Sequence, residues 1–195
     1  MNRKNDVSII IVHFKVKQLL IDCLESIYKN TQGVSFEIIV VDNDELKTIS
    51  VDLKRRFPQI IYIPNKNRGF AQGNNAGAKK ARGDFLFFVN PDTEFLPGLL
   101  ENLVSFIKNK KNVGAVSPLL LTWKMKSQKV VGSKFPSPIS AIFSLSFINR
   151  IFPNNSVSKS FFLRKWNMKE PLMVDVFPGT AFLIRKKIFE KTGGF

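Results

Sequence analysis

The sequence has little of the chemistry that supports a zinc site, a disulfide framework or a nucleotide-binding glycine motif. Its 195 residues hold one cysteine, Cys23, and one histidine, His13. One cysteine excludes a disulfide within these residues and fits a reducing compartment, and the two together cannot fill a four-ligand zinc site. No Gly-x4-Gly-Lys-Ser/Thr segment occurs, which excludes a P-loop. Gly69, Gly73 and Gly77 are spaced four apart, which is not a dinucleotide fingerprint; such spacing lets a helix pack closely or lets backbone N–H groups approach a ligand.

Long apolar runs are also missing. No stretch reaches the roughly 18–20 apolar residues that a membrane-spanning helix needs, and the best candidate, residues 139–152, contains three serines, Asn149 and Arg150. The polar residues 1–6 and the short apolar run after them do not make a secretory signal. We therefore expect a cytoplasmic protein that does not span the membrane, and we expect any membrane contact to be peripheral, at the inner face of the plasma membrane.

Acidic residues are scarce, and the excess of basic over acidic residues is unevenly distributed along the chain. Fifteen Asp and Glu residues stand against 30 Lys and Arg residues, a net charge of +15. Residues 1–118 hold 17 basic and 12 acidic residues (net +5), whereas residues 119–195 hold 13 and 3 (net +10). Residues 119–169 contain nine basic residues, no acidic one and many aromatic side chains. Such a segment suits an anionic partner, either lipid head groups or nucleic acid, and a solvated basic face is the alternative.

Apolar residues make up 44% of the chain, which is enough for a packed core. Continuous apolar runs predict buried strands at residues 8–12, 36–41, 60–63, 84–89 and 113–116. Helical spacing predicts helices at residues 16–30, 46–57, 74–81 and 98–110. This alternation predicts an α/β fold, a mostly parallel sheet with helices on both faces. The pattern breaks down after residue 119, and order returns at residues 174–177 and in a strand-to-helix segment at residues 181–191.

Polar residues follow four of the predicted strands, at His13, Asp42, Asn65 and Asn90. The carboxyl ends of parallel strands meet at one edge of the sheet, where such folds bind ligands. Asp42 can accept hydrogen bonds from a ribose hydroxyl or a base N–H, or cap a helix. His13 can face the ligand or serve as a hydrogen-bonded structural residue. Arg68 can pair with a diphosphate or a base, or simply lie on the surface.

Asn90-Pro91-Asp92 directly follows the most apolar predicted strand. A carboxylate at that place can hold a hard divalent cation through oxygen, with phosphates completing the coordination shell. The same three residues also make a good turn. The tripeptide by itself therefore does not decide between a metal site and a turn.

Four segments together are more specific than any one of them. They occur in order at residues 7–14 (VSIIIVHF), 37–43 (EIIVVDN), 67–77 (NRGFAQGNNAG) and 90–93 (NPDT). The set resembles the nucleotide-sugar half of a family 2 glycosyltransferase with the GT-A (Rossmann-like) fold, in the rhamnosyltransferase-like branch of bacterial surface-polysaccharide enzymes. The resemblance covers residues 7–118 and resumes at residues 177–195.

The resemblance implies a nucleotide pocket built from the predicted loops. His13 and Phe14 would line the pocket, and Asp42 would contact the pyrimidine nucleoside. The loop with Asn67 and Arg68 would close over the base and the diphosphate. The donor would be a UDP-sugar or a dTDP-sugar, which present similar pyrimidine edges.

The resemblance also implies where the chemistry takes place. Asn90 and Asp92 match the family's Asp-x-Asp element, so Asp92 would hold Mg²⁺ or Mn²⁺ against the diphosphate, and Asn90 would bond the ribose or a water. Gly179 and Thr180 would lie near the acceptor, a glycan or lipid-linked glycan. The expected reaction is inverting sugar transfer that builds a bacterial surface glycan.

The same resemblance places the catalytic base, an acidic residue, some way beyond Phe195. After residue 118 the chain has only Glu170, Asp175 and Glu190 as acidic residues, none of them in that context. We therefore expect residues 1–118 to form the nucleotide-sugar-binding half and residues 119–195 a truncated, basic acceptor-side region. Such a chain would bind a nucleotide sugar but transfer it poorly.

An alternative that the charge leaves open is a non-catalytic basic protein that binds nucleic acid or an anionic membrane through residues 119–169. No recognised nucleic-acid motif accompanies the charge, so nucleic acid is the disfavoured partner. An anionic membrane surface is compatible with the enzyme interpretation, with residues 139–152 lying in the interface behind Pro136 and Pro138 as a helix start.

Overall fold

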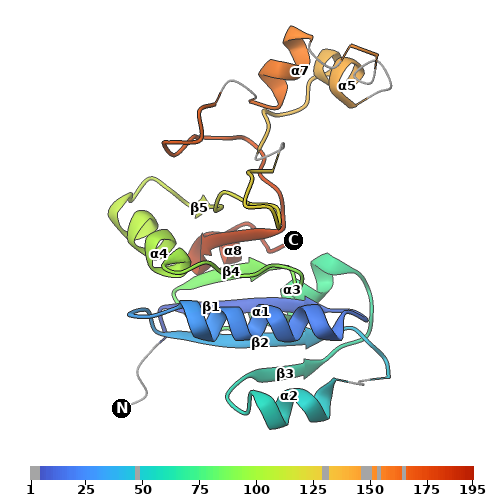
Figure 1. Cartoon of the computed structure of the whole chain (residues 1–195), viewed down its shortest axis with the longest axis vertical. Helices are drawn as coiled ribbons and strands as arrows, with labels where there is room; N and C mark the ends of the chain where they lie inside the picture. Colours follow the sequence, from blue (N-terminus) through green and yellow to red (C-terminus); the bar gives the residue numbers. More distant parts are fainter. Residues whose placement is uncertain (1–4, 47–48, 129–131, 146–150, 153–154, 164–165) are drawn as a thin grey trace. The chain divides into compact units, whose positions relative to one another are not determined.

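The computed structural model describes residues 5–46, 49–128, 132–145, 151–152, 155–163 and 166–195. The chain divides into two compact units, the first formed by residues 1–118 and 179–195 and the second by residues 119–178 (Figure 1). Residues 179–195 thus fold together with residues 1–118. The assignment of a donor half and an acceptor half to these parts stays a prediction.

The first unit is built on a six-stranded sheet with the order β3-β2-β1-β4-β6-β5. The first four strands by sequence pair in parallel, and β6 runs antiparallel to both β4 and β5. The strands are β1 (Val7–His13), β2 (Phe36–Asp42), β3 (Ile61–Pro64), β4 (Phe85–Val89), β5 (Ala115–Val116) and β6 (Ala181–Arg185). Strands covered on both faces need apolar side chains at every position, which explains the continuous apolar runs of β1, β2 and β4.

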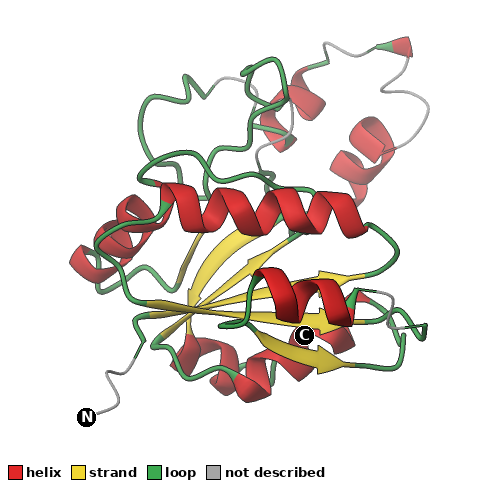
Figure 2. Ribbon diagram, turned by 60° about the horizontal axis from the view of Figure 1, so that its bottom comes forward, coloured by secondary structure: helices red, strands yellow, loops and turns green. Residues whose placement is uncertain are grey.

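Helices cover both faces of this sheet (Figure 2), which confirms the predicted α/β class. Their apolar residues recur every three or four positions, so that one side of each helix is buried; in α4 this side consists of Leu100, Leu103, Val104 and Ile107. The helices are α1 (Lys17–Asn30), α2 (Ser50–Arg56), α3 (Phe70–Lys80), α4 (Leu99–Asn109) and α8 (Lys186–Lys191). Residues 47–48, which belong to the predicted helix 46–57, lie outside the described residues.

The start of α3 differs from the prediction, which kept residues 64–73 as a loop. Gly69 has a φ of +92°, a backbone conformation that favours glycine, and the helix begins directly after it. Gly77 then lies so close to β1 that a Cβ there would be 2.5 Å from Cγ2 of Ile10. The glycines in this helix therefore bring it close to the sheet. The sequence did not indicate the first turn of the helix, because glycine has no apolar side chain that would add to a helical pattern.

Phe88 in β4 is fully buried at the centre of an aromatic cluster. Its ring lies 5.1 Å from Phe182, 5.0 Å from Phe189 and 5.1 Å from Phe195, centroid to centroid. Asn75 in α3 holds the last of these residues in place, because its side chain bonds both the N–H and the C=O of Phe195. Residues 181–195 thus contribute side chains to the core beneath β4.

Among the described residues of the second unit, the short helices α5 (Pro138–Leu145) and α7 (Ser156–Phe161) pack on each other. The order expected at residues 174–177 is limited to one antiparallel bridge between Ser133 and Val176. Residues 146–150, part of the apolar candidate 139–152, lie outside the described residues. Among the helices that the structure describes, none has both the length and the apolar character to cross a membrane.

Candidate functional site

The predicted site residues lie in a row along the edge where β1 to β4 end, called here the carboxyl edge. In sheet order the row runs from Arg68 after β3, through Asp42 and His13 at the ends of β2 and β1, to Asn90 after β4 and Thr180 before β6. Neighbouring strands are about 4.8 Å apart, so the ends of β3 and β4 are separated by roughly 14 Å. The order of the strands therefore assembles the site from distant parts of the sequence.

His13 and Asp42 form a buried pair at the centre of this edge. Nδ1 of His13 lies 2.8 Å from Oδ1 of Asp42, and both side chains are inaccessible to solvent. Nε2 of His13 accepts a hydrogen bond from the backbone N–H of Val16 at 3.2 Å. Because Nε2 must keep its lone pair for this bond, the hydrogen-bond network assigns the proton to Nδ1 and the imidazole is neutral. This arrangement favours the structural interpretation of the histidine.

Asp42 accepts further hydrogen bonds that fix its carboxylate. The hydroxyl of Tyr62 donates to Oδ2 at 2.5 Å, and the backbone N–H of Asp44 donates to Oδ1 at 3.0 Å. Burial, together with the hydrogen bond to Asp42, raises the pKa of the Tyr62 phenol above its ordinary value near 10, so the phenol stays a donor. Asp42 does not cap the following helix, because α2 begins at Ser50. Its carboxylate instead ties together the ends of β1, β2 and β3.

Tyr62 was missed by reasoning from the sequence. The signal was present, since Tyr62 carries the only polar side chain in the predicted strand 60–63. Asn43 was missed as a site residue because short polar residues after strands are common, and Asn65 was noted only as the start of a loop at the predicted ligand-binding edge. Asn65 donates through Nδ2 to Oδ1 of Asn43 at 2.8 Å, and the N–H of Asn43 donates to the C=O of His13 at 2.9 Å. These bonds hold the loops after β1, β2 and β3 in one arrangement.

The side chains that can reach a ligand lie around this buried network. Phe14 is 46% exposed, and Nζ of Lys15 lies 5.2 Å from its ring centroid. Arg68 is exposed, and Oδ1 of Asn67 accepts the N–H of Gly69 at 3.2 Å. An exposed aromatic ring and a guanidinium group can stack on a planar base or pair with an anion.

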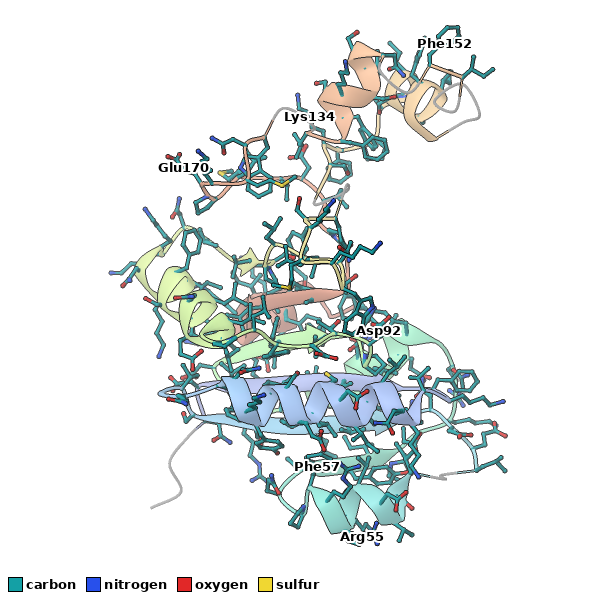
Figure 3. All side chains as sticks on the ribbon, in the orientation of Figure 1. Arg55, Phe57, Asp92, Lys134, Phe152 and Glu170 are labelled. Carbon is teal, nitrogen blue, oxygen red and sulfur yellow. The ribbon has the colours of Figure 1, made fainter. Side chains whose placement is uncertain are left out.

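The other end of the row joins β4 to β6. The N–H of Asn90 donates to the C=O of Thr180 at 2.8 Å, because β6 runs back along β4. The C=O of Asn90 accepts the N–H of Thr93 in a turn, which leaves Asp92 exposed at the carboxyl edge (Figure 3). Gly179 is exposed, with no atom within 4 Å of the position that a Cβ would take. The metal-site candidate and the acceptor-side candidates are therefore neighbours.

The donor set around Asp92 fits a cation that a substrate helps to coordinate. Among the described residues no group of three or more His, Cys, Asp or Glu side chains is placed to hold a metal ion. Cys23 lies close to Asp92, and burial raises the pKa of its thiol to about 12, which favours the protonated thiol. One exposed carboxylate can hold Mg²⁺ when phosphate oxygens and waters complete the octahedron.

Comparison with known proteins identifies the family. Residues 8–193 match the model of glycosyl transferase family 2. An uncharacterized glycosyltransferase, YwdF of Bacillus subtilis, is 35% identical over 105 residues, 52% of this chain and 38% of that protein. The minor teichoic acid biosynthesis protein GgaB of the same organism is 30% identical over 120 residues, 57% of this chain and 13% of that protein. The chain thus spans less than half the length of these curated relatives.

Solved structures show the same fold. The mannosyltransferase PcManGT from Pyrobaculum calidifontis, solved with GDP-Man and Mn²⁺, superposes with a TM-score of 0.61 at 19% identity, covering 100% of this chain and 48% of that one. Staphylococcus aureus TarS 1–349 superposes with a TM-score of 0.55 at 16% identity, covering 96% and 49%. With the family match over nearly its whole length, the chain belongs to glycosyltransferase family 2 and has the GT-A fold.

Proposed function

We propose that the protein is an inverting glycosyltransferase that uses a UDP-sugar or dTDP-sugar as donor and contributes to a bacterial surface glycan. The row of residues along the carboxyl edge carries this proposal, because it offers the guanidinium of Arg68 after β3, the exposed ring of Phe14 after β1 and the carboxylate of Asp92 after β4. Such a row of side chains suits a ligand with a planar base at one end and a diphosphate toward the other. The name of GgaB, a teichoic acid biosynthesis protein, supports the surface-glycan part.

At the base end, the pyrimidine is held against the exposed ring of Phe14, with Arg68 and Asn67 closing over the base and the diphosphate. His13 and Asp42 act mainly through position. Both side chains are buried and bonded to each other, so they fix the loop that presents Phe14 and leave ligand contacts to the neighbouring atoms. Tyr62 supports them through its hydrogen bond to Asp42.

At the diphosphate end, Asp92 holds Mg²⁺ or Mn²⁺ and Asn90 bonds the ribose or a water. When bound, the cation neutralises negative charge that develops on the leaving nucleoside diphosphate. The GDP-Man and Mn²⁺ bound to PcManGT support a divalent cation at this kind of site. Asp92 suits this role because it is exposed at a turn that the buried strand β4 holds in place.

Gly179 and Thr180 flank the place where an acceptor hydroxyl approaches the donor. The acceptor is a glycan or a lipid-linked glycan, and the enzyme works from the cytoplasmic side, attached to the inner face of the plasma membrane. Residues 1–195 by themselves transfer sugar weakly. Two of their three acidic side chains beyond residue 118 are engaged in other contacts. The carboxylate of Asp175 accepts the N–H of Phe135 at 2.9 Å, and Glu190 lies 3.8 Å from Lys186.

Isothermal titration calorimetry with UDP, dTDP and GDP, each with and without Mn²⁺, tests this function. We expect a pyrimidine nucleotide to bind with Mn²⁺, and Asp92→Asn to weaken that binding by about tenfold or more, equivalent to ~1.4 kcal/mol. Glu190→Gln removes one carboxylate from the distant surface of α8 and serves as the matched control, with unchanged affinity. Binding that is indifferent to both Mn²⁺ and Asp92, or no nucleotide binding by the folded protein, contradicts the proposal.

A further inference from the structure

In the second unit, α5 turns apolar side chains outward and a serine inward. In α5, Ile139 is 63% exposed and Ile142 is 54% exposed, whereas Ser140 is 7% exposed. On α7, which packs against α5, Ser158 is fully buried. A helix in water normally buries its apolar side and exposes its polar side. The reversed arrangement indicates that the exposed side of α5 meets an apolar environment.

Hydrogen bonds account for the buried serines. At the start of α5, Oγ of Ser137 accepts the N–H of Ser140, and Oγ of Ser140 accepts the N–H of Ser137, which is a reciprocal cap. Pro138 occupies the first helical position, where its missing N–H costs nothing. Oγ of Ser158 donates to the C=O of Phe143 at 2.9 Å and joins the two helices. Because the serines stabilise the helix start and the helix pair, the orientation of α5 is set by its own contacts.

The apolar side of α5 is continuous. Ile139, Ile142 and Phe143 are spaced by three and four positions, so they lie on one side of the helix, and all three are exposed. No charged residue occurs between Pro138 and Leu145. Outside α5, Phe135, Ile151 and Phe152 of the same unit are exposed as well.

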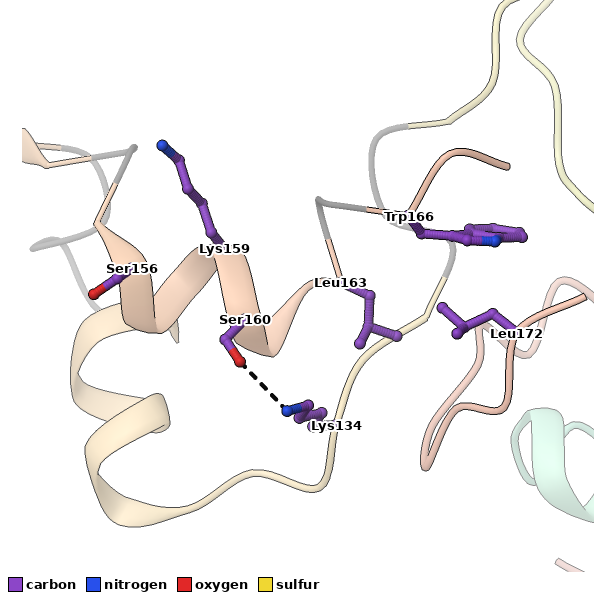
Figure 4. Close-up of a pocket in the computed structure, with 7 residues that line it drawn as sticks. All are labelled: Lys134, Ser156, Lys159, Ser160, Leu163, Trp166 and Leu172. Atoms are coloured by element: carbon purple, nitrogen blue, oxygen red, sulfur yellow. Dashed lines mark hydrogen bonds between the residues drawn. The ribbon is translucent and has the colours of Figure 1, made fainter. Parts of the chain in front are cut away.

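A basic pocket of about 550 Å³ lies in the same unit (Figure 4). Lys134 supplies an ammonium group, and its Nζ lies 3.4 Å from Oγ of Ser160. Lys159 also lines the pocket, with its ammonium group pointing away from Lys134. The opposite wall is apolar, formed by Leu163, Trp166 and Leu172. None of the lining residues is acidic; they are Lys134, Ser156, Lys159, Ser160, Leu163, Trp166 and Leu172.

The chemistry of the pocket matches an anionic head group attached to a hydrocarbon chain. Ammonium and hydroxyl groups can bond phosphate oxygens, and the apolar wall can cover the first carbons of the chain. The two acidic residues of the unit, Glu170 and Asp175, do not line the pocket, so no carboxylate competes with the ligand there. Nucleic acid would use the cations but not the exposed isoleucines, whereas a lipid surface uses both.

We propose that the second unit docks on an anionic lipid bilayer, with the exposed side of α5 in contact with acyl chains and a head-group phosphate in the pocket beside Lys134 and Ser160, where Lys159 adds positive charge at the pocket's edge. This proposal deepens the membrane attachment proposed above and names the surface responsible. The pocket and the helix are linked, because α7 supplies Lys159 and Ser160 and packs on α5.

Co-sedimentation of the 195-residue protein with lipid vesicles tests the proposal. The vesicles consist of phosphatidylcholine alone or of phosphatidylcholine with phosphatidylglycerol. We expect binding only to the anionic vesicles, weakened by salt, and not displaced by millimolar inorganic phosphate. Lys134→Glu with Lys159→Glu should weaken binding by at least about tenfold. Ile139→Asn with Ile142→Asn should weaken it several-fold and abolish the part that resists salt.

Matched controls separate surface-specific effects from general ones. Lys110→Glu with Lys111→Glu makes the same charge change on exposed residues of the first unit, and Val51→Asn removes an exposed apolar side chain from α2. Both should leave vesicle binding unchanged. Nucleotide binding with Mn²⁺, measured on every variant, should also stay unchanged, which reports that the protein is folded and keeps failure of the docking proposal distinct from failure of the donor site.

Three outcomes overturn the proposal. The first is no binding to anionic vesicles at low salt, or equal loss of binding in the control and test variants. The second is a concentration-dependent dimer in analytical ultracentrifugation that the Ile139→Asn and Ile142→Asn protein loses while its vesicle binding stays intact, because the exposed side of α5 would then be covered by a second copy. The third is tight, salt-dependent binding of an oligonucleotide that competes with vesicles and requires Lys134 and Lys159 but not the isoleucines.

Discussion

The two units of this protein use apolar residues in opposite ways. In the first, the central strands bury large apolar side chains completely: Ile9, Phe87 and Phe88 have no exposed surface. In the second, Phe135 is 74% exposed and the isoleucines of α5 lie outside. A sheet covered on both faces buries apolar side chains at every position of a strand, whereas the short helices α5 and α7 have no such covered layer. The difference indicates that the first unit is stabilised by its own core, whereas the second keeps its apolar surface for a partner.

The largest expected effect contrasts one buried and one exposed apolar residue. Phe88→Ala removes the ring at the centre of the aromatic cluster and should lower the free energy of unfolding by about 3–5 kcal/mol. Ile139→Ala removes an exposed side chain from α5 and should change it by less than about 0.5 kcal/mol. Urea unfolding followed by circular dichroism measures both. A comparable loss in the two variants would break the comparison between the units.

The next effect concerns the polar network of the first unit. Asp42→Ala leaves the Tyr62 hydroxyl and the Nδ1–H of His13 without their acceptor and should cost about 3 kcal/mol. Asp92→Ala, at an exposed position, should cost less than about 0.5 kcal/mol while abolishing Mn²⁺-dependent nucleotide binding. Thermal unfolding and calorimetry on the pair separate a positioning role from a ligand contact. Stability that is unchanged in Asp42→Ala would argue against the positioning role.

Close packing of α3 on the sheet predicts a smaller loss. A methyl group at Gly77 would meet Ile10, and such overpacking costs about 1–3 kcal/mol. The higher helix propensity of alanine offsets about 1 kcal/mol of this, so Gly77→Ala should destabilise by about 1 kcal/mol. Gly179→Ala, where a Cβ has open space, should be neutral in the same urea titration. A stabilised Gly77→Ala protein would show that the helix can move away from the sheet.

Within the second unit, the expected loss of stability comes from the hydrogen bond between α5 and α7. Ser158→Ala removes the hydrogen bond to the C=O of Phe143 and leaves that buried region one donor short, at a cost of about 1 kcal/mol. Hydrogen exchange of the amides in α5 and α7 measures the loss locally. Protection in β1 should not change, since β1 belongs to the first unit. Equal loss of protection in β1 would mean that the units unfold together.

The smallest expected change in stability comes from removing an exposed ion pair in the first unit. Hydrogen bonds from Lys108 and Ser35 lower the pKa of Asp6 below its ordinary value near 3.8. Because the folded pKa is the lower one, the stabilisation is present above about pH 3.8 and is lost as the pH falls through the folded pKa. Lys108→Ala should therefore reduce stability at pH 7 by no more than about 0.5 kcal/mol, and the difference should vanish in strong acid. A larger loss of stability at low pH than at pH 7 would contradict this prediction.

Several elements could be predicted from the sequence because their signals are local. Apolar runs identified β1, β2 and β4, and the polar residues after them fell at the carboxyl edge. On α8, Lys186 and Glu190 lie 3.8 Å apart, because helical residues four positions apart are neighbours. The helix start at Phe70 was missed because its glycines hide the apolar period, and Tyr62 was missed because a tyrosine in a strand more often packs than bonds a carboxylate.

The sequence alone determined the fold class, the order of the loops and the family, since apolar periodicity and short motifs depend on neighbouring residues. Tertiary structure alone decided which residues meet. The return of β6 along β4 places Thr180 at Asn90, and the pairing of β2 with β3 brings the Tyr62 hydroxyl to the carboxylate of Asp42. It also decided that Ser140 and Ser158 lie inside the second unit and Ile139 and Ile142 outside. Contacts between distant residues depend on strand pairing and helix packing, which no local pattern specifies.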